Sequence, residues 1–330
     1  MTIDGLRVLV TGGCGFIGSH ITQSLSNKGA QVIAFDNFSS GYRENLEGLS
    51  GDVRIIQGDI MDYRKLSRAC KGLDVISHQA AQLEITKALA DPITDLKVNT
   101  EGTLNVFRAA VENGIRKIIY ASSAGVYGEA RTLPQTEEHP TDPNWPYGVS
   151  KLAGEKYADI YSKYYGIEIS CLRYGIVYGP REWYGRVLTL FLRRALEGKP
   201  PVLWGGDQIR DFIFVTDVVD FHNRLLEESD RAVGVFNVGS GQGTTIRNLA
   251  ELVVETYHLE EPKYEDTGEG EMSKEVKGRK RLPLELKRMV LDNSKAKKLG
   301  WRPEVSLIEE IKKEYAWLQN NVHRWKELRY

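Results

Sequence analysis

A strand, a glycine-rich turn and a helix are encoded in LRVLVTGGCGFIGSH, residues 6–20. The apolar residues Leu6, Val8, Leu9 and Val10 form a run that is too short for a helix, which predicts a buried parallel strand. Gly12, Gly15 and Gly18 follow at the spacing G-x-x-G-x-x-G, and apolar residues then return at helical spacing. Gly12 permits a tight turn, Gly15 lets the backbone approach a diphosphate, and Gly18 lets the helix pack on the strand. The alternative is an ordinary glycine-rich loop, but the helix that follows favours a dinucleotide site.

An acidic residue at the end of the next predicted strand indicates which dinucleotide the chain binds. Residues 31–35 form this strand, and Asp36 ends it. A carboxylate at this place accepts hydrogen bonds from both ribose hydroxyls of adenosine and repels a 2′-phosphate. Arg43 lies nearby in the sequence and could serve such a phosphate. The acid leads us to predict NAD, rather than NADP, as the cofactor.

The ends of the third and fourth predicted strands carry further candidate cofactor contacts. Asp59 follows the strand over residues 53–57, and it either accepts from the adenine amino group or caps the next helix. His78 follows the strand over residues 73–77, and we favour a structural role over metal binding because no set of ligands surrounds it. The contacts predicted from the turn and the strand ends are Gly12, Gly15, Phe16, Ile17, Gly18, Asp36, Asn37, Asp59, Ile60, Ala80 and Ala81.

Strands and helices alternate along the first half of the chain. A long amphipathic helix is predicted over residues 95–113, and a fifth strand over residues 115–121. Asn99 in this helix either holds loop backbone beside the nucleotide or faces solvent, and we include it among the candidate cofactor contacts. Repeated strand–helix–strand units imply right-handed crossovers and a doubly wound parallel sheet of the α/β class. Ligands of such sheets bind at the carboxyl ends of the strands.

Three polar residues after the fifth strand have the spacing that redox chemistry on an alcohol requires. Ser123 follows the strand, while Tyr147 and Lys151 are four residues apart on one face of a predicted helix. Free tyrosine has a pKa near ~10 and is a poor base at neutral pH. A lysine ammonium one turn away and a nicotinamide cation both stabilise the phenolate, which then takes a proton from an alcohol. Ser123 would bind the same substrate oxygen, so we predict Ser123, Tyr147 and Lys151 as the catalytic residues; the alternative is an unremarkable surface helix.

Together, these motifs resemble the extended short-chain dehydrogenase/reductases, which are the NAD-dependent epimerases and dehydratases of nucleotide sugars. The resemblance covers nearly the whole chain and is carried by T-G-G-C-G-F-I-G-S-H, Asp36, G-D-I, S-S-A-G-V-Y-G and Y-G-V-S-K. It implies a Rossmann-type sheet over residues 1–173 that binds NAD and carries the catalytic residues. Residues 174–330 are expected to form a smaller mixed α/β substrate domain, with segments that cross back to the first. Tyr147, Lys151 and Tyr174 are also expected to contact the cofactor.

The reaction is predicted from what is absent beside the catalytic serine. Family members that dehydrate a sugar carry an Asp-Glu pair there, and decarboxylating members often carry a Glu, whereas this chain has Ala124-Gly125. The pattern resembles the UDP-hexose 4-epimerases, which oxidise carbon 4 of a UDP-sugar to a ketone and return the hydride to its other face. The alternatives are a dehydratase, a decarboxylase or a UDP-glucuronate 4-epimerase of the same family. A non-catalytic NAD-binding regulator is a further alternative, against which the intact Ser123, Tyr147 and Lys151 argue.

The resemblance also assigns a UDP-sugar site to the second half of the chain. Trp204 is expected to stack on uracil, although a core tryptophan is the alternative, and Arg210 of R-D-F is expected to bind the diphosphate. Arg281 is the closest candidate for a second diphosphate arginine, about one position from the usual place. Ile176 stands where related epimerases commonly have Asn, so the identity of the sugar stays open. Most of the charged segment 260–282 is expected to be a mobile loop.

Composition limits the remaining classes of partner. The chain has 330 residues, 41% of them hydrophobic and 27% charged, with a net charge of −1, so attraction to nucleic acid or an anionic membrane is not expected. Three widely spaced cysteines predict reduced thiols and no metal, and the early first strand predicts a cytoplasmic protein without a signal peptide. The helices over residues 95–113 and 147–165 carry apolar residues on more than one face. The corresponding helices join the two subunits of related enzymes, so we expect a homodimer.

Overall fold

Seven parallel strands form the main sheet, in the order β10-β6-β5-β4-β1-β2-β3. The computed structural model describes residues 2–49, 51–182, 185–228, 232–304 and 306–324. The strands of this sheet are β1 (Arg7–Thr11), β2 (Gln31–Asp36), β3 (Val53–Gln57), β4 (Val75–His78), β5 (Lys117–Ser123), β6 (Glu168–Tyr174) and β10 (Gly234–Val238). The strand order reverses between β1 and β4, which is the switch point of a Rossmann-type sheet. The predicted fold class is confirmed.

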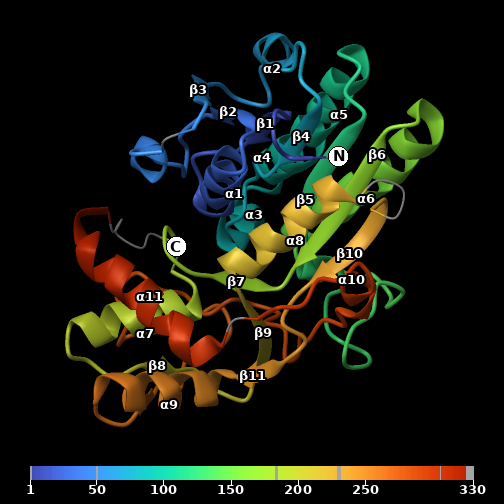
Figure 1. Ribbon diagram of the computed structural model, residues 1–330. Coiled ribbons are helices and arrows are strands. Elements are labelled where there is room, and N and C mark those ends of the chain that lie inside the picture. Colours follow the sequence, from blue (N-terminus) through green and yellow to red (C-terminus); the bar gives the residue numbers. More distant parts are fainter. Residues whose placement is uncertain (1, 50, 183–184, 229–231, 305, 325–330) are drawn as a thin grey trace.

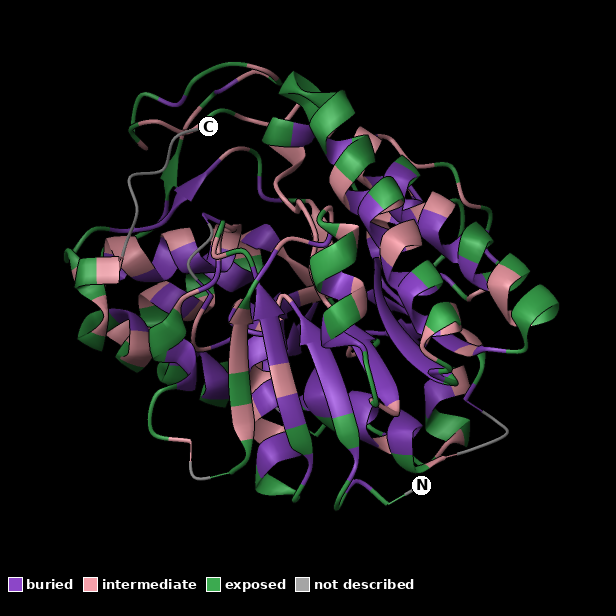
Figure 2. Cartoon of the chain, turned by 90° about the horizontal axis from the view of Figure 1, so that it is seen from above, coloured by how far each residue is buried: buried purple, intermediate pink, exposed green. Residues whose placement is uncertain are grey.

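Helices cover both faces of this sheet (Figure 1). They are α1 (Phe16–Asn27), α2 (Tyr63–Ala69), α3 (Ile85–Ala90), α4 (Pro92–Leu96), α5 (Gly102–Glu112), α6 (Pro146–Tyr165) and α8 (Val215–Glu227). Side chains alternate across a strand, so Val8 and Val10 pack in the cluster with α1 and α8, while Leu9 packs with α2, α5 and α6. Figure 2 shows most of the strands buried between the helical layers, with exposed residues on the outer sides of the helices, whereas the edge strand β3 has no buried residue.

The predicted helix over residues 95–113 is interrupted. It begins earlier, as α4 at Pro92, and a turn of π-helix at Lys97–Glu101 separates α4 from α5. Asp91 caps α4, because its carboxylate Oδ1 accepts from the backbone N of Thr94 at 3.0 Å. Such π-turns occur frequently at functional sites.

The second half of the chain forms a smaller layer below the main sheet in Figure 1. Strands β7 (Ile176–Tyr178), β9 (Ile209–Phe214) and β11 (Gly243–Thr245) form one sheet, and β8 (Val202–Leu203) pairs with β12 (Lys263–Tyr264). Helices α7 (Val187–Leu196), α9 (Ile246–Tyr257) and α11 (Leu307–Asn320) complete it, while α10 (Ser294–Lys298) packs against β10 of the main sheet. Strand β10 returns to the main sheet beside β6. The division into residues 1–173 and 174–330 stays a prediction.

The charged segment 260–282 is tied into the fold rather than loose, which corrects the expectation of a mobile loop. Strand β12 pairs in parallel with β8. Met272 and Lys280 form an antiparallel bridge, and Glu265 binds the side chains of Trp204 and Ser273. Hydrophobic periodicity did not reveal this order because polar contacts stabilise it.

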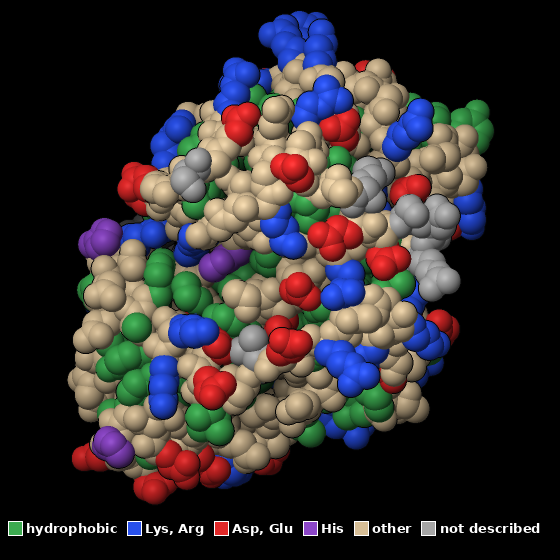
Figure 3. All heavy atoms as spheres, viewed as in Figure 1, with side chains coloured by type: hydrophobic (Ala, Val, Ile, Leu, Met, Phe, Trp, Pro, Cys, Tyr) green, Lys and Arg blue, Asp and Glu red, His purple; other side chains and the backbone are tan. Residues whose placement is uncertain are grey.

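Charged side chains of both signs are interspersed over the face of the molecule shown in Figure 3. Within the part of the chain that the structure describes, no helix is long and apolar enough to cross a membrane. Cys14, Cys70 and Cys171 are buried free thiols.

Candidate active site

The turn between β1 and α1 depends on glycine at Gly12 and at Gly18. Gly12 has φ +65°, and a Cβ placed on it would lie 2.8 Å from the backbone N of Ala80. A Cβ on Gly18 would collide with the carbonyl oxygen of Gly12, so glycine allows helix α1 to approach β1. Glycine is therefore required by a positive φ at one position and by close packing at the other.

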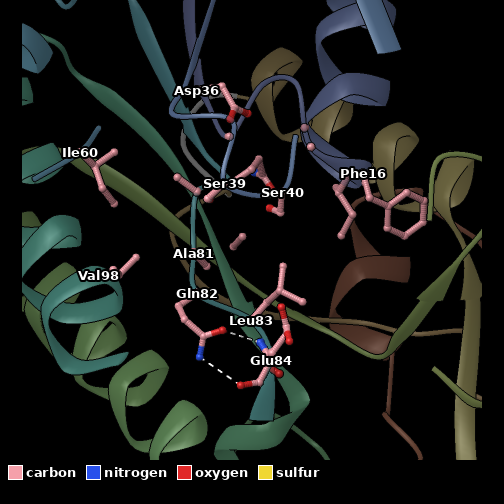
Figure 4. Close-up of a pocket in the computed structure, with 18 of the residues that line it drawn as sticks. Phe16, Asp36, Ser39, Ser40, Ile60, Ala81, Gln82, Leu83, Glu84 and Val98 are labelled. Atoms are coloured by element: carbon pink, nitrogen blue, oxygen red, sulfur yellow. Dashed lines mark hydrogen bonds between the residues drawn. The ribbon is translucent and has the colours of Figure 1, made fainter. Parts of the chain in front are cut away.

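A cavity of about 330 Å³ opens at the carboxyl ends of the strands, where the chain order reverses. Figure 4 shows Phe16, Asp36, Ile60 and Ala81 around it. The predicted cofactor contacts that line the cavity are Gly12, Gly15, Phe16, Ile17, Gly18, Asp36, Asn37, Asp59, Ile60, Ala80, Ala81, Tyr147, Lys151 and Tyr174. Asn99 is the one predicted contact outside this lining.

Asp36 is fixed by the backbone of two loops. Its Oδ2 accepts from the backbone N of Cys14 at 2.9 Å, and its Oδ1 accepts from the backbone N of Phe38 at 2.8 Å. Burial raises the pKa of this carboxyl, and these N–H donors act in the opposite direction. The guanidinium of Arg43 stacks on the Phe38 ring at 4.6 Å. Asp36 therefore presents a fixed carboxylate at the end of β2, where it can accept hydrogen bonds from hydroxyl groups.

Asp59 fixes a turn rather than capping a helix. Its Oδ1 accepts from the backbone N of Met61 at 2.8 Å, and its Oδ2 accepts from the side-chain amide of Asn37 at 2.9 Å. The cap of α2 is Asp62, which accepts from the backbone N of Lys65 at 3.1 Å. The capping alternative for Asp59 is therefore wrong.

Asn99 lies one layer behind the cavity. It is only 1% exposed, so the alternative of a solvent-facing amide is wrong. Its side chain exchanges two hydrogen bonds of 2.8 Å with the backbone of Gln82 and donates to Asp95 at 2.9 Å. Gln82 itself lines the cavity, so Asn99 supports the wall.

A second cavity of about 310 Å³ adjoins the first. The predicted substrate contacts Ser123, Tyr147, Trp204, Arg210 and Arg281 all line it. The residues common to both linings are Leu83, Ser123, Tyr147, Tyr174, Gly175 and Arg186. Two of the three predicted catalytic residues therefore stand where the cavities meet, and the third, Lys151, lines the first cavity beside them.

Tyr147 lies at this junction, in the first turn of α6. The helix begins one residue earlier, at Pro146. Burial raises the pKa of its hydroxyl to about 12, while the charge of Arg186 and a hydrogen bond with Ser123 act against burial. The Ser123 hydroxyl also accepts from the backbone N of Gly125 at 3.1 Å. The hydroxyl groups of the predicted serine and tyrosine are therefore paired.

Lys151 lies one turn along α6 and is 2% exposed. Its Nζ donates to the carbonyl oxygen of Ala121 at 2.8 Å and lies 5.9 Å from the centre of the Tyr147 ring. Burial lowers the pKa of this amine to about 8, and the charge of Asp95 acts to raise it. The ammonium is thus held at the cofactor side of the tyrosine.

The far end of the second cavity is cationic and aromatic. Glu285 lies between the two predicted diphosphate arginines, 3.8 Å from Arg210 and 3.3 Å from Arg281. Arg210 also donates to the carbonyl oxygen of Leu286 at 2.7 Å. Trp204 is only half-buried and lines the cavity, so the alternative of a core tryptophan is wrong.

Two contributors to the site were missed in the sequence. Arg186 is the single charged residue among the described residues common to the two linings, and Glu285 joins the two arginines. Arg186 lies just before α7, which begins at Val187, and no motif in the sequence marked it. Nothing local marked Glu285, because its role depends on Arg210 of a distant strand.

Known proteins share this architecture. The sequence profile of the NAD dependent epimerase/dehydratase family matches residues 8–239. The chain belongs to this family. It is 36% identical over 322 residues to the putative UDP-glucose 4-epimerase of Methanocaldococcus jannaschii, covering 95% of this chain and 99% of that protein.

Two solved structures are similar over nearly the whole chain. The UDP-glucose 4-epimerase of Thermotoga maritima with UDP-glucose has a TM-score of 0.86 at 33% identity, and the match covers 96% of this chain and 100% of that one. The UDP-glucose 4-epimerase of Thermus thermophilus in complex with NAD has a TM-score of 0.84 at 35% identity, with coverage of 96% and 100%.

NAD is the cofactor of this epimerase/dehydratase family member, and the first cavity fits it. Gly15 lines this cavity at the turn between β1 and α1, where a residue without a Cβ lets the backbone approach a diphosphate. The Asp36 carboxylate ends β2, where it suits ribose hydroxyls. These two features would hold the adenosine and diphosphate, and Tyr147 and Lys151 would flank the nicotinamide.

Proposed function

We propose that this protein is an NAD-dependent 4-epimerase of a UDP-sugar, of the UDP-glucose/UDP-galactose type or its N-acetyl form. Support comes from the similarity to UDP-glucose 4-epimerases and from Tyr147 and Ser123 at the junction of the two cavities, with Lys151 beside them. The diphosphate would bind at Arg210 and Arg281, and the base would stack on Trp204.

The observation that carries the choice of reaction is the lining next to Ser123. Ala124 and Gly125 occupy the wall of the second cavity there, and neither offers an acid or a base. Glu285 is the one carboxylate among the described residues of that lining, and it is bound to the two arginines at the far end. Elimination of water needs an additional proton donor near the sugar, whereas epimerisation needs only the residues around Tyr147.

In the proposed mechanism, the phenolate of Tyr147 takes the proton of the carbon 4 hydroxyl as the hydride leaves that carbon. Ser123 donates a hydrogen bond to the same oxygen. Bound NAD supplies the hydride acceptor and a positive charge beside the tyrosine. Lys151 is held by Ala121 at the cofactor side, where its charge favours the phenolate. After the sugar turns over, Tyr147 returns the proton as the opposite face is reduced.

The test is NMR of the purified protein with UDP-glucose, UDP-galactose, their N-acetyl forms and UDP-glucuronate, without added cofactor. The proposal expects the carbon 4 epimer to accumulate until equilibrium, with no NADH released. A 4-keto-6-deoxy product would identify a dehydratase, and loss of carbon dioxide would identify a decarboxylase. No turnover of any sugar by NAD-loaded protein would favour the regulator.

We also propose that the protein acts as a homodimer. Exposed apolar side chains lie on two neighbouring helices, with Ile93 and Leu96 on α4 and Val149 and Ile160 on α6. All four are more than half exposed, and pairing with a second copy would remove them from water.

A further inference from the structure

Two buried carboxyl groups lie behind the wall that the two cavities share. Glu182 follows β7 and Glu314 belongs to α11, and both are at most 1% exposed. A buried carboxylate is costly unless charges or hydrogen bonds compensate it. The contacts of this pair therefore indicate what it does.

Glu314 joins three elements. Its Oε2 accepts from the backbone N of Gly179 at 3.1 Å, and its Oε1 is hydrogen-bonded to the Thr189 hydroxyl at 3.1 Å. The backbone N of Glu182 donates to the carbonyl oxygen of the same Gly179 at 3.1 Å. Glu314 therefore binds the residue that also fixes the backbone of Glu182.

Burial raises the pKa of both carboxyl groups. It brings that of Glu182 to about 7, and it raises that of Glu314 well above its ordinary value, with the charge of Glu182 adding to the effect. The two acids are therefore expected to titrate together.

The pair is connected to the reaction chamber through Arg186. The guanidinium Nε lies 3.6 Å from Glu182 Oε1, and its Nη1 donates to the carbonyl oxygen of Val177 at 2.9 Å. Arg186 is the charged residue common to both cavity linings, and its charge favours the phenolate of Tyr147.

We propose that Glu182 and Glu314, joined through the backbone of Gly179, position Arg186 so that its charge faces Tyr147. The effect of this arrangement on turnover rests on the proposed function, whereas the arrangement itself does not depend on it. Glu182 and Glu314 are positioning residues, because they act through Arg186. Helix α11 thereby supports the active site, although none of its residues lines either cavity.

The loop that carries Glu182 is also fixed on the cofactor side. The carbonyl oxygen of Pro180 is hydrogen-bonded to His20 Nε2 at 2.9 Å, and Arg181 donates to Gln23 of α1 at 2.7 Å. A contact made by α11 can thereby reach Arg186 through Gly179 and Glu182. Other titratable groups near the pair are Tyr178 of β7, Glu310 of α11 and Asp217 of α8. Burial, and then the charges of Glu314, Glu310 and Asp217, raise the pKa of Tyr178.

The experiment measures the ionisation midpoint of Tyr147 in NAD-loaded protein, from the ultraviolet difference spectrum against Tyr147→Phe. Arg186→Gln should raise this midpoint by at least ~0.5 unit, because a stabilising charge is lost. Glu182→Gln should also raise it, because Arg186 loses its anchor. The double variant should shift it no further than Arg186→Gln alone.

The direction in which Glu182→Gln shifts the Tyr147 midpoint separates positioning of Arg186 from a direct electrostatic effect of Glu182. If Arg186 stayed in place, removing the negative charge of Glu182 would lower the Tyr147 midpoint instead. An unchanged or lowered midpoint in Glu182→Gln, or additive shifts in the double variant, would overturn the proposal.

Helix α11 is tested with two variants of one residue. Glu314→Leu should raise the Tyr147 midpoint as Glu182→Gln does, because the bonds to Gly179 and Thr189 are lost. Glu314→Gln should keep it near the wild-type value, since an amide can accept from Gly179 and donate to Thr189. Glu309→Gln, exposed on the same helix, is the matched control. Equal midpoints in Glu314→Leu and Glu314→Gln would overturn the role of the pair.

This readout does not need a substrate. If no UDP-sugar is turned over but the midpoints shift as expected, the proposed function fails and the positioning of Arg186 stands. If epimerisation is found, the same variants should lower kcat and leave KM for the UDP-sugar nearly unchanged. A rise in KM with unchanged kcat would contradict the proposal that Glu182 and Glu314 act on Tyr147 through Arg186.

Discussion

Trp204 and Glu265 are joined by a hydrogen bond, in which the indole Nε1 donates to Oε2 at 2.9 Å. The same carboxylate accepts from the Ser273 hydroxyl and from the backbone N of Lys274, each at 2.6 Å. Burial alone would raise the pKa of Glu265, but these donors hold it at about 2. One ionised residue therefore fixes both the indole of the proposed base site and the segment that leads to Arg281.

Glu265→Gln should weaken binding of the UDP-sugar more than it weakens turnover. An amide cannot accept all three bonds, so the Trp204 ring loses its fixed orientation. Loss of a hydrogen bond corresponds to about a 2- to 10-fold rise in KM. Steady-state kinetics on the active UDP-sugar measures this, with the exposed Glu261→Gln as control. Equal KM values in Glu265→Gln and the wild type would argue against Trp204 as the base platform.

Asp36→Asn should reduce NAD retention. The carboxylate accepts backbone bonds from Cys14 and Phe38 and is proposed to bind ribose hydroxyls, whereas an amide keeps one acceptor oxygen. We expect Kd for NAD to rise about 10- to 100-fold, and discrimination against NADP to fall. Calorimetric titration of NAD-free protein with both cofactors measures this. Exposed Asp52→Asn is the control, and unchanged NAD affinity in Asp36→Asn would remove Asp36 from the site.

Lys151 should make the NAD-free protein more stable as pH rises from about 8 to 10. Burial lowers its folded-state pKa to about 8, whereas the unfolded value is near ~10.4, so the unfolded chain binds more protons in this window. The free energy of unfolding should therefore rise by on the order of 2 kcal/mol for this group.

Urea unfolding of the wild type and Lys151→Met across this pH range measures the effect. The variant should lack the rise, since methionine does not titrate. Parallel pH profiles for the two proteins would show that Lys151 stays charged in the folded state.

The residues that could be predicted from sequence are those whose roles are set by local spacing. Gly12 and Gly18 lie in one turn, and Tyr147 and Lys151 lie one helical turn apart, so the chain itself brings them together. Parallel strands then deliver Ser123 and Asp36 to the same edge of the sheet.

The contributors that could not be predicted depend on partners far along the chain. Glu265 contacts Trp204, and Glu314 contacts Gly179, and neither pair has a periodic or motif signal. Asn99 holds the backbone of Gln82, which is one of its two predicted roles, and it lies one layer behind the cavity lining.

The protein should be a dimer at micromolar concentration. Ile160 of α6 and Ile93 of α4 are 54% and 59% exposed, and burying such side chains gives about 1.5–3 kcal/mol each. Ile160→Glu should therefore shift the mass to that of a monomer in light scattering. Ile308→Glu is a control, because Ile308 is also exposed but lies on α11. A strictly monomeric wild type would refute the proposed assembly.

Tyr147→Phe removes the ionisable hydroxyl and leaves the ring in place. Loss of a general base costs about 10²–10⁴-fold in kcat, and NAD content should stay normal because most of the cavity lining is elsewhere. Lys151→Met should cost more, since it removes both a charge that favours the phenolate and a proposed cofactor contact. Ser123→Ala should cost less than either, because the tyrosine still transfers the proton. Turnover and bound NAD, measured together for the three variants, test this order; near-normal turnover by Tyr147→Phe with normal NAD content would mean that another residue is the base.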